Sequence, residues 1–388
     1  MRRPTIRAIL ATELSHPTPG EETGVMVSRA QVLAYRAAAH GLTPARGADA
    51  VLDVGAQDHP TGTTAQLAIE LRGAGGDDTV LVHSVRAATH LHRPADLGLL
   101  AAALRVDDAT DFAKQAIGPF GRDVGDRFGA GTDEVAAAMV DVMSDGHPRT
   151  KGELSGAVSP RVAREFVPWC AGCGVHHVQD ALFRHATLQA GLTIEVESSR
   201  LFRFLPPMGP GPGGMPVDAA RAELVRRFVH AAGPVRPADL AVWLSLAPSA
   251  AKSWWSLVED ELRPVTVAGH TGWALAADAE LLDDPPEPPW LRLLGPYDPL
   301  TEVADRELLA PDPGHRRRVW APAGNPGIVL RDGGLAGTWR RRSTKGRLDI
   351  TVAPFAGLPS DWVDAVGADA GTIARFFGAS DVRLELAS

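Results

Sequence analysis

The sequence predicts an α+β protein built from tandem winged-helix units, each a helix-turn-helix followed by a wing, with a β-rich C-terminal domain. Two observations lead to this prediction: three short helices followed by a hairpin can be read twice along the chain, and strand patterns dominate after residue 290. In addition, the proline-rich stretches 205–216 and 283–290 can continue neither a helix nor a sheet, so they divide the chain into parts.

The middle part of the chain shows this order most clearly. A first helix can be capped by Asp218, a second has Pro237 at its first position, and a third follows Pro248 and places apolar residues on one side as far as Leu262. Residues 264–275 then alternate as the two strands of a hairpin around a glycine-containing turn. This is the order of a winged helix, although any small α+β domain could share it.

The same order occurs earlier in the chain. Thr132 can cap a first helix, Thr150 opens a second with a capping box, and Ser159 with the proline after it opens a third. Two strand-like runs, 192–196 and 200–205, follow as the expected wing. Two units of one unusual order are stronger evidence than one.

The N-terminal region is consistent with a third unit, because it carries a capped helix over 28–42 and a strand-like run at 80–85. The expected regions are 1–128 with a candidate catalytic loop, 129–205 with a CxxC, 217–280, and 290–388.

The last region reads as strands. Runs at 327–333, 335–342 and 347–355 are separated by Asp-Gly and Lys-Gly pairs, which favour tight hairpin turns. The chain then ends with a predicted helix over 369–378.

Composition excludes several classes of protein. The 388 residues are 45% hydrophobic and 22% charged, as in an ordinary globular protein, and no apolar run reaches membrane length. The basic N-terminus has only a short apolar stretch before Glu13, so we expect neither export nor a membrane anchor. Two cysteines three apart exclude a disulfide-framed secreted protein and make the cytoplasm the expected compartment.

A net charge of −8 argues against nucleic-acid binding by the whole surface, but not by a local basic face. The densest basic cluster straddles the second C-terminal turn: Arg340, Arg341, Arg342, Lys345 and Arg347. A second cluster is Arg316, Arg317 and Arg318. A hairpin could present several of these cations to a phosphate backbone; the alternative is a solvated strand edge that is charged to prevent pairing. Trp339 beside the first cluster is expected to be core.

Cys170 and Cys173 have a zinc-ligand spacing, and His176, His177 and His185 follow them. Cys170, Cys173 and His177 are the candidate metal ligands, with no fourth ligand identified; thiol chemistry and plain packing remain alternatives. The pair is expected where the wing of its unit would lie, so we expect a structural zinc rather than a catalytic one.

The sequence GAQDHP, residues 55–60, places polar side chains in a turn-like stretch. Gln57 and Asp58 could orient a water or stabilise developing positive charge, or Asp58 could simply form the turn before Pro60. The chain lacks a phosphate-binding glycine loop, a nucleophile elbow and a dinucleotide fingerprint, so no nucleotide or nucleophile chemistry is predicted.

Six segments together resemble the bacterial winged-helix DNA-binding family that includes the AlkZ/YcaQ-type crosslink-repair DNA glycosylases. They are VSRAQVLAYRAAAHGL, VGAQDHP, VRAATHLHRPADL, GPVRPADLAVWL, and LLGPYDPLTEVADRELL with DGGLAGTWRRR. The resemblance implies three winged-helix motifs around a channel for duplex DNA, and excision of bulky alkylated purines with no metal or organic cofactor.

The family's catalytic loop carries glutamine, an apolar residue, and then glutamine or aspartate. In this sequence Gln57 matches the last of these positions, Ala56 the apolar one, and Gly55 departs from the first. The resemblance therefore implies that Gln57, with Asp58 beside it, positions water and supports an oxocarbenium-like sugar.

Three functions follow as hypotheses: a glycosylase acting on double-stranded DNA, a non-catalytic DNA-binding protein on the same scaffold, or an acidic enzyme for a small molecule. The last has no cofactor or nucleophile motif in its favour. The first two place the protein in the cytoplasm, at the nucleoid, with DNA as partner and no membrane; they predict no particular protein partner.

Overall fold

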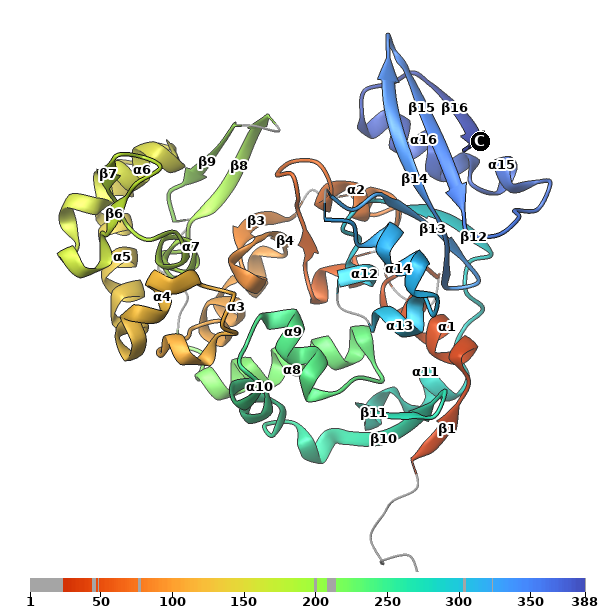
Figure 1. Cartoon of the computed structure of the whole chain (residues 1–388), viewed down its shortest axis with the longest axis horizontal. Helices are drawn as coiled ribbons and strands as arrows, with labels where there is room; N and C mark the ends of the chain where they lie inside the picture. The colour runs from red at the N-terminus through yellow and green to blue at the C-terminus, as the bar shows by residue number, and fades with distance from the viewer. Residues whose placement is uncertain are drawn as a thin grey trace, which may run out of the picture.

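The structure is a computed structural model that describes residues 24–43, 47, 49–75, 78–198, 201–207, 214–302, 305–322 and 324–387. The N-terminal segment for which we expected no export signal, and residues 208–213 of the 205–216 linker, lie outside these residues. Helices and strands are mixed along the described chain, so the predicted α+β class is confirmed at this level (Figure 1). In the same residues, no helix is both long and apolar enough to cross a membrane.

A six-stranded sheet in the order β2-β4-β3-β8-β9-β5 joins the first two predicted regions. Its strands are β2 (Ala56–Gln57), β3 (Val80–His83), β4 (Thr89–His92), β5 (Arg149–Thr150), β8 (Thr193–Ser198) and β9 (Leu201–Leu205). β3 meets β8 where Leu81 pairs with Ile194, so the sheet runs across the boundary expected at residue 128. The candidate catalytic loop therefore starts from a sheet strand and is not on a separate surface lobe.

The helices around this sheet correct two predictions. α5 (Phe128–Met143) begins before Thr132, whose hydroxyl donates to the carbonyl of Phe128 inside the helix and caps nothing. α6 (Lys151–Val158) has the predicted capping box at Thr150. Ser159–Arg161 then forms a short 3-10 turn, because Val162 is already extended, and the third helix is α7 (Asp180–Gln189).

The middle of the chain has the predicted helices at slightly different bounds: α8 (Val217–Ala232), α9 (Pro237–Leu244) and α10 (Pro248–Trp255). Asp218 lies in the first turn of α8 rather than at its cap. α10 ends before Val258, which packs into the core from a loop, and Leu262 already begins strand β10.

β10 (Leu262–Val267) and β11 (His270–Leu275) form the predicted hairpin, with a turn of only two residues. The N-terminal strand β1 (Val25–Val27) adds to β10 in parallel. It leads into α1 (Arg29–Ala39), where Ser28 makes a capping box with Gln31.

Three further helices lie in the N-terminal region, before α5: α2 (Ala65–Glu70), α3 (Leu97–Ala103) and α4 (Gly118–Val124). α3 packs against α8, and the two contribute to the largest apolar core cluster together with α9 and α10. This contact joins the N-terminal region to the middle of the chain.

The C-terminal region is β-rich, as predicted, and the three expected strand runs belong to a five-stranded sheet in the order β12-β13-β14-β15-β16. Its strands are β12 (Leu291–Leu294), β13 (Gly327–Arg331), β14 (Gly334–Thr344), β15 (Arg347–Pro354) and β16 (Asp381–Leu386), and α15 (Trp362–Ala365) and α16 (Gly367–Phe376) pack on it. Both predicted turns are present; Asp332 and Lys345 adopt left-handed backbone with φ of 49° and 35°.

α11 (Ala279–Asp283) precedes this sheet, and three short helices, α12 (Pro299–Glu302), α13 (Arg306–Leu309) and α14 (Pro313–Val319), lie between its strands β12 and β13. In Figure 1 the β8–β9 and β14–β15 hairpins both stand at the upper edge of the molecule, with α2 between them. The helix that follows the candidate loop thus lies between two projecting hairpins.

Candidate catalytic loop and nucleic-acid interface

Gln57 lies at the end of β2, opposite His90 of β4. Its side-chain oxygen accepts a hydrogen bond of 2.5 Å from Nη2 of Arg86. Because a guanidinium can only donate, the oxygen of the carboxamide must face Arg86, which fixes the orientation of the amide. One lone pair of that oxygen and the NH2 group remain available to a water or a substrate.

Arg86 is itself held from three directions. Its backbone is left-handed, with φ of 57°, its Nη1 donates to the carbonyl of Trp243 at 2.8 Å, and its Nη2 lies 3.5 Å from Glu302. Burial lowers the pKa of Arg86 and raises the pKa of Glu302, whereas the charge of each residue favours the ionised form of the other. Gln57 is therefore anchored through Arg86 to α9 and α12.

Asp58 points the other way, into the loop. Its Oδ1 accepts from the backbone N–H groups of Thr63, Thr64 and Ala65 at 3.0–3.1 Å, and its Oδ2 accepts from the N–H of Gly62. The residue is 4% exposed. This carboxylate closes the turn that leads into α2, which is the structural alternative that the sequence left open.

Gly55 has no room for a side chain. Its φ is +80°, and a Cβ there would lie 2.2 Å from Cε1 of His92. Since β2 pairs Ala56 with Leu91 and Gln57 with His90, the next cross-strand neighbours are Gly55 and His92, on the same face as Gln57. The imidazole of His92 thus fills the space in which the family's first glutamine would begin.

His92 is buried and held by a 2.8 Å hydrogen bond between its Nε2 and the hydroxyl of Ser84. Burial lowers the pKa of His92 to about 4, so the ring is neutral near pH 7.

Two cavities lie on either side of the loop. One, of about 190 Å³, is lined by Gln57, Asp58 and His59 together with Lys151 and Arg184. The other, of about 620 Å³, is lined by the same His59 and loop as well as by Arg340 and Arg341 of β14. The loop that contains His59 therefore has the cavity of Gln57 on one side and the cavity of Arg340 and Arg341 on the other.

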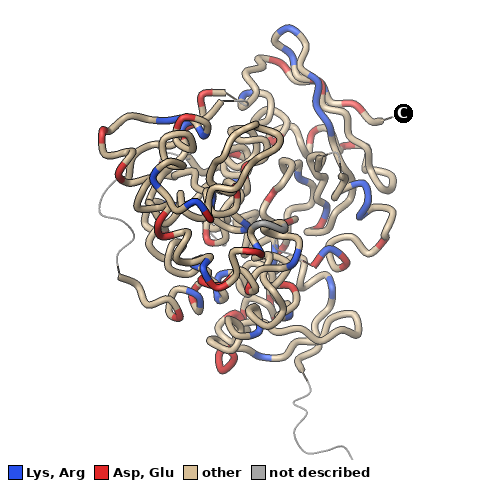
Figure 2. Tube along the Cα trace, turned by 60° about the vertical axis from the view of Figure 1, so that its left-hand side comes forward, with Lys and Arg blue, Asp and Glu red and all other residues tan. Residues whose placement is uncertain are grey.

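The basic hairpin presents its cations on two faces. The guanidinium of Arg341 lies 3.5 Å from the centre of the Phe377 ring, on the same side as buried Trp339. By strand alternation, Arg340 and Arg342 point to the opposite face. Lys and Arg colour both the tip of this hairpin and the length of β14 below it (Figure 2).

The remaining predicted cations differ in how far they are engaged. Lys345 is exposed at the tip, while Arg347 donates to Asp349 at 2.8 Å. On α14, Arg316 donates to two backbone carbonyls and pairs with Glu307, whereas Arg317 is exposed. Arg318, also on α14, donates to the carbonyl of Ala353 and packs on Phe355.

The cysteines lie on a small two-stranded ribbon, β6 (Trp169–Cys170) and β7 (Val175–His176). The ligand atoms of Cys170, Cys173 and His177 lie within 4.8 Å of one another. A hydrogen bond with His177, the largest cause, lowers the pKa of Cys170 to about 7. The ribbon precedes α7, so our expectation that it occupies the wing position was wrong; the hairpin after the third helix is β8–β9.

The other two histidines of this segment do not join the cysteines. His176 bonds to the carbonyl of Val167, and the ring of His185 packs on Phe112 and Phe128.

Several site residues were not singled out from the sequence. Arg86, His92 and Glu302 are not among the candidate site residues that the sequence predicts. Their one signal in the sequence is that all three lie in segments that carry the family resemblance, whereas their contacts depend on the fold: Arg86 bonds to Gln57, His92 lies against Gly55, and Glu302 pairs with Arg86.

An amide side chain fixed by a half-buried arginine, beside an exposed basic hairpin, is an arrangement that suits a polyanionic ligand. The family model described as "DNA glycosylase AlkZ-like" matches residues 70–376, and the chain belongs to this family. The matched stretch begins after the loop that holds Gln57.

Among solved structures, the DNA glycosylase AlkZ of Streptomyces sahachiroi matches with a TM-score of 0.71 and 24% identity, over 94% of this chain and all of that one. At this identity the likeness establishes a shared fold. The curated proteins include no match.

Proposed function

We propose that this protein is a DNA glycosylase that hydrolyses the N-glycosidic bond of bulky alkylated purines in double-stranded DNA. The observation that supports this most is the fixed Gln57 carboxamide in a cavity whose loop also borders Arg340 and Arg341. Membership of the AlkZ-like family supports the same reaction.

In the proposed reaction, Gln57 holds a water through the free lone pair of its oxygen or through its NH2 group. The water oxygen bonds to C1′ of the sugar while the bond from C1′ to the purine breaks. The bonding electrons go to the base and neutralise the positive charge that alkylation placed on it, and the water proton passes to solvent. Arg86 keeps the amide in place, and no metal or organic cofactor is needed.

Asp58 supports this chemistry indirectly in our proposal. Its carboxylate accepts hydrogen bonds from four backbone N–H groups, so it holds the loop in shape and thereby fixes the backbone position of the neighbouring Gln57. Water positioning is left to Gln57.

We infer that the phosphate backbone is gripped by the C-terminal hairpin through Arg340, Arg342 and Lys345, with Arg317 as an outer contact. Arg341, Arg347 and Arg316, which are engaged within the protein, would contribute less. Phosphate contacts of this kind hold the duplex in register without reading its sequence.

We also propose that α5, α6 and α7 with β8–β9, and α8, α9 and α10 with β10–β11, are winged-helix units. With the N-terminal region and the C-terminal sheet they make the four regions expected from the sequence, of which 1–128 and 129–205 share a sheet. Chromosomal DNA as substrate would place the protein in the cytoplasm, at the nucleoid.

The Cys170, Cys173 and His177 group fits a structural zinc ion in our proposal. In the turn between β6 and β7, the N–H groups of Cys173 and Gly174 donate to the carbonyl of Cys170. This turn brings the two sulfurs close together, and a ring nitrogen of His177 lies close enough to join them as a ligand. We expect about one zinc per chain in protein purified without added metal, and none in a Cys170→Ser, Cys173→Ser double variant. Zinc well below stoichiometry in the unaltered protein would reject the site.

A non-catalytic DNA-binding role is the second candidate, and Gly55 favours it, because the family's first glutamine is missing. The two are separated with a duplex that contains a single N7-methylguanine. We expect the protein to release the free base, Gln57→Ala to release it at least about a hundredfold more slowly, and Gln115→Ala, an exposed glutamine in a turn, to match the unaltered protein. Binding without release by any of the three would favour the non-catalytic role.

A further inference from the structure

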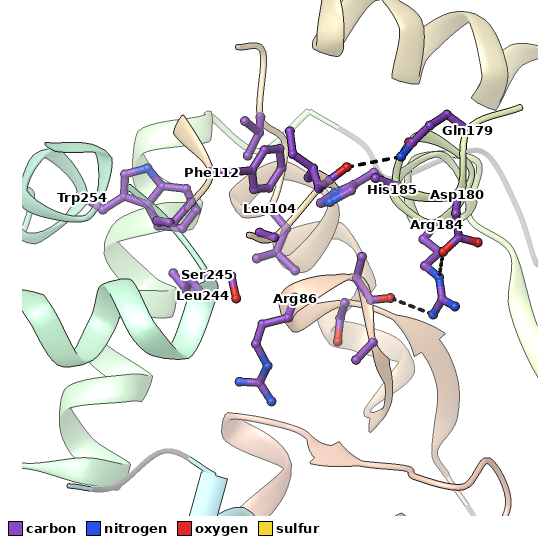
Figure 3. A pocket seen from close by; sticks show the side chains of 18 residues that line it. Arg86, Leu104, Phe112, Gln179, Asp180, Arg184, His185, Leu244, Ser245 and Trp254 are labelled. Carbon is purple, nitrogen blue, oxygen red and sulfur yellow. Dashed lines mark hydrogen bonds and ion pairs between the residues drawn. The ribbon is translucent and has the colours of Figure 1, made fainter. Parts of the chain in front are cut away.

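A third cavity, of about 330 Å³, lies between α7 and the α9–α10 pair. Its apolar walls are Leu104, Val106, Phe112, Leu244, Leu246 and Trp254. Figure 3 shows Trp254 on one side of the cavity and His185 and Gln179 on the other, with Arg86 at its lower border. The proposed chemistry makes no use of this cavity.

The backbone around the cavity has an energetically unfavourable conformation at three residues. Arg86, Ala87 and Ser245 all line it and all have positive φ, of 57°, 50° and 54°. Ser245 is fixed by its carbonyl, which accepts from the N–H of Ala113 at 2.9 Å, beside the bridge between Phe112 and Leu246. Such non-glycine residues persist where the surroundings impose them, and they gather at binding sites.

This cavity adjoins the one that Gln57 lines. Ala88 and Arg184 line both. Arg184 is held between them by Asp180, at 2.8 Å, and by the carbonyl of Ala87, at 3.5 Å. The two cavities therefore meet at Ala88 and Arg184, which a substituent reaching from Gln57 into this cavity would have to pass.

The part of the cavity that is lined by aromatic and aliphatic side chains suits a flat, uncharged ring system. Its histidine, His185, packs on the rings of Phe112 and Phe128 with centroids 5.1 and 5.5 Å away, and burial keeps it neutral. A cavity of about 150 Å³ can hold benzene, so this one has room for a fused pair of rings. The charged groups, Arg86, Asp180 and Arg184, belong to the border on the Gln57 side, where a nucleotide would lie.

We propose that this cavity is a subsite for the apolar, aromatic substituent of an alkylated purine while its glycosidic bond lies at Gln57. The inference rests on the proposed glycosylase function and names the part of the substrate that would give the enzyme its preference for bulky lesions.

The test compares two duplexes that differ only in the lesion, N7-methylguanine or N7-(2-naphthylmethyl)guanine. We expect the unaltered protein to prefer the naphthylmethyl duplex at least tenfold in kcat/KM. Ala116→Trp fills the rim of the cavity from an exposed position, and Ala181→Phe fills it from α7. Both should remove the preference and leave release of the methylated base nearly unchanged.

Ala219→Trp, at an exposed position of α8 that does not line the cavity, is the matched control and should retain the preference. Equal kcat/KM for the two lesions in the unaltered protein, or a preference that survives both filling variants, would overturn the subsite.

Dissociation constants measured with the same duplexes separate this inference from the proposed function. If neither base is released, the glycosylase proposal fails, but a tenfold tighter binding of the naphthylmethyl duplex that is lost in Ala116→Trp would still support the subsite. If methylguanine is released through Gln57 and the filling variants affect both duplexes equally, the subsite fails and the glycosylase proposal stands.

Discussion

Substitution of Asp58 separates a structural role from a catalytic one. In Asp58→Ala, the backbone N–H groups of residues 62–65 lose the carboxylate that satisfies them. Hydrogen bonds to a charged group contribute about 1.5–3 kcal/mol each, but the loop can open to water and recover part of this. We therefore expect a loss of about 3–5 kcal/mol in the free energy of unfolding. Asp58→Asn keeps the Oδ1 acceptor and loses only the bond to Gly62, so it should cost about 1–2 kcal/mol.

The assay follows the melting temperature and the rate of base release for the same variants. Asp58→Ala should lower both, Asp58→Asn should lower the melting temperature slightly and retain most of the rate well below that temperature, and Gln57→Ala should lower the rate alone. An Asp58→Asn variant that keeps its melting temperature but loses release as fully as Gln57→Ala would refute the structural role and make Asp58 a catalytic residue.

Three other predictions concern the same region. Burial lowers the pKa of His92 to about 4, below the value of about 6.5 expected in the unfolded chain. Between these two pH values the unfolded state therefore binds more protons than the folded state. The contribution of His92 to the free energy of unfolding should be fully present above pH 6.5 and should fall by up to about 1.4 kcal/mol per pH unit towards pH 4. A melting series over this range should have a smaller slope in His92→Gln; an equal slope would contradict the prediction. Gly55→Ala should cost about 2–4 kcal/mol, because its Cβ meets the His92 ring at positive φ, and clearly less in a His92→Ala background; equal costs measured by denaturant unfolding in the two backgrounds would reject the steric account. Arg342→Gln should reduce the slope of log Kd against log salt by about 0.9, since one phosphate contact is lost; an unchanged slope would remove Arg342 from the interface.

Much of the architecture could be predicted because its signals are local. The Thr150 capping box, the turn at Lys345 and the alternation of β14 each depend on a few neighbouring residues, and the structure has all three. The predicted helix at Ser159 failed because Pro160 can open a helix but cannot make the residues after it continue one. The helix that replaced it, α7, lies beyond the cysteine ribbon, where the sequence gives little indication of a third helix.

The candidate site was predictable only in part, for the same physical reason. Gln57 and Asp58 are adjacent in sequence, so the loop could be found, but their different roles depend on partners far along the chain. Arg86 reaches Gln57 from a left-handed turn, and Glu302 reaches Arg86 from α12. The effect of Gly55 became clear only when its cross-strand neighbour, His92, could be placed beside it.

The most direct test of the account is a single-turnover titration of base release against protein concentration, with a duplex containing one N7-alkylguanine. The account predicts that Gln57→Ala lowers the rate at saturation at least about a hundredfold with little change in the half-saturating concentration. Arg342→Gln should do the reverse, raising the half-saturating concentration while the saturated rate stays the same. A saturated rate that is unchanged in Gln57→Ala would contradict the central claim that this residue performs the chemistry on DNA held by the basic hairpin.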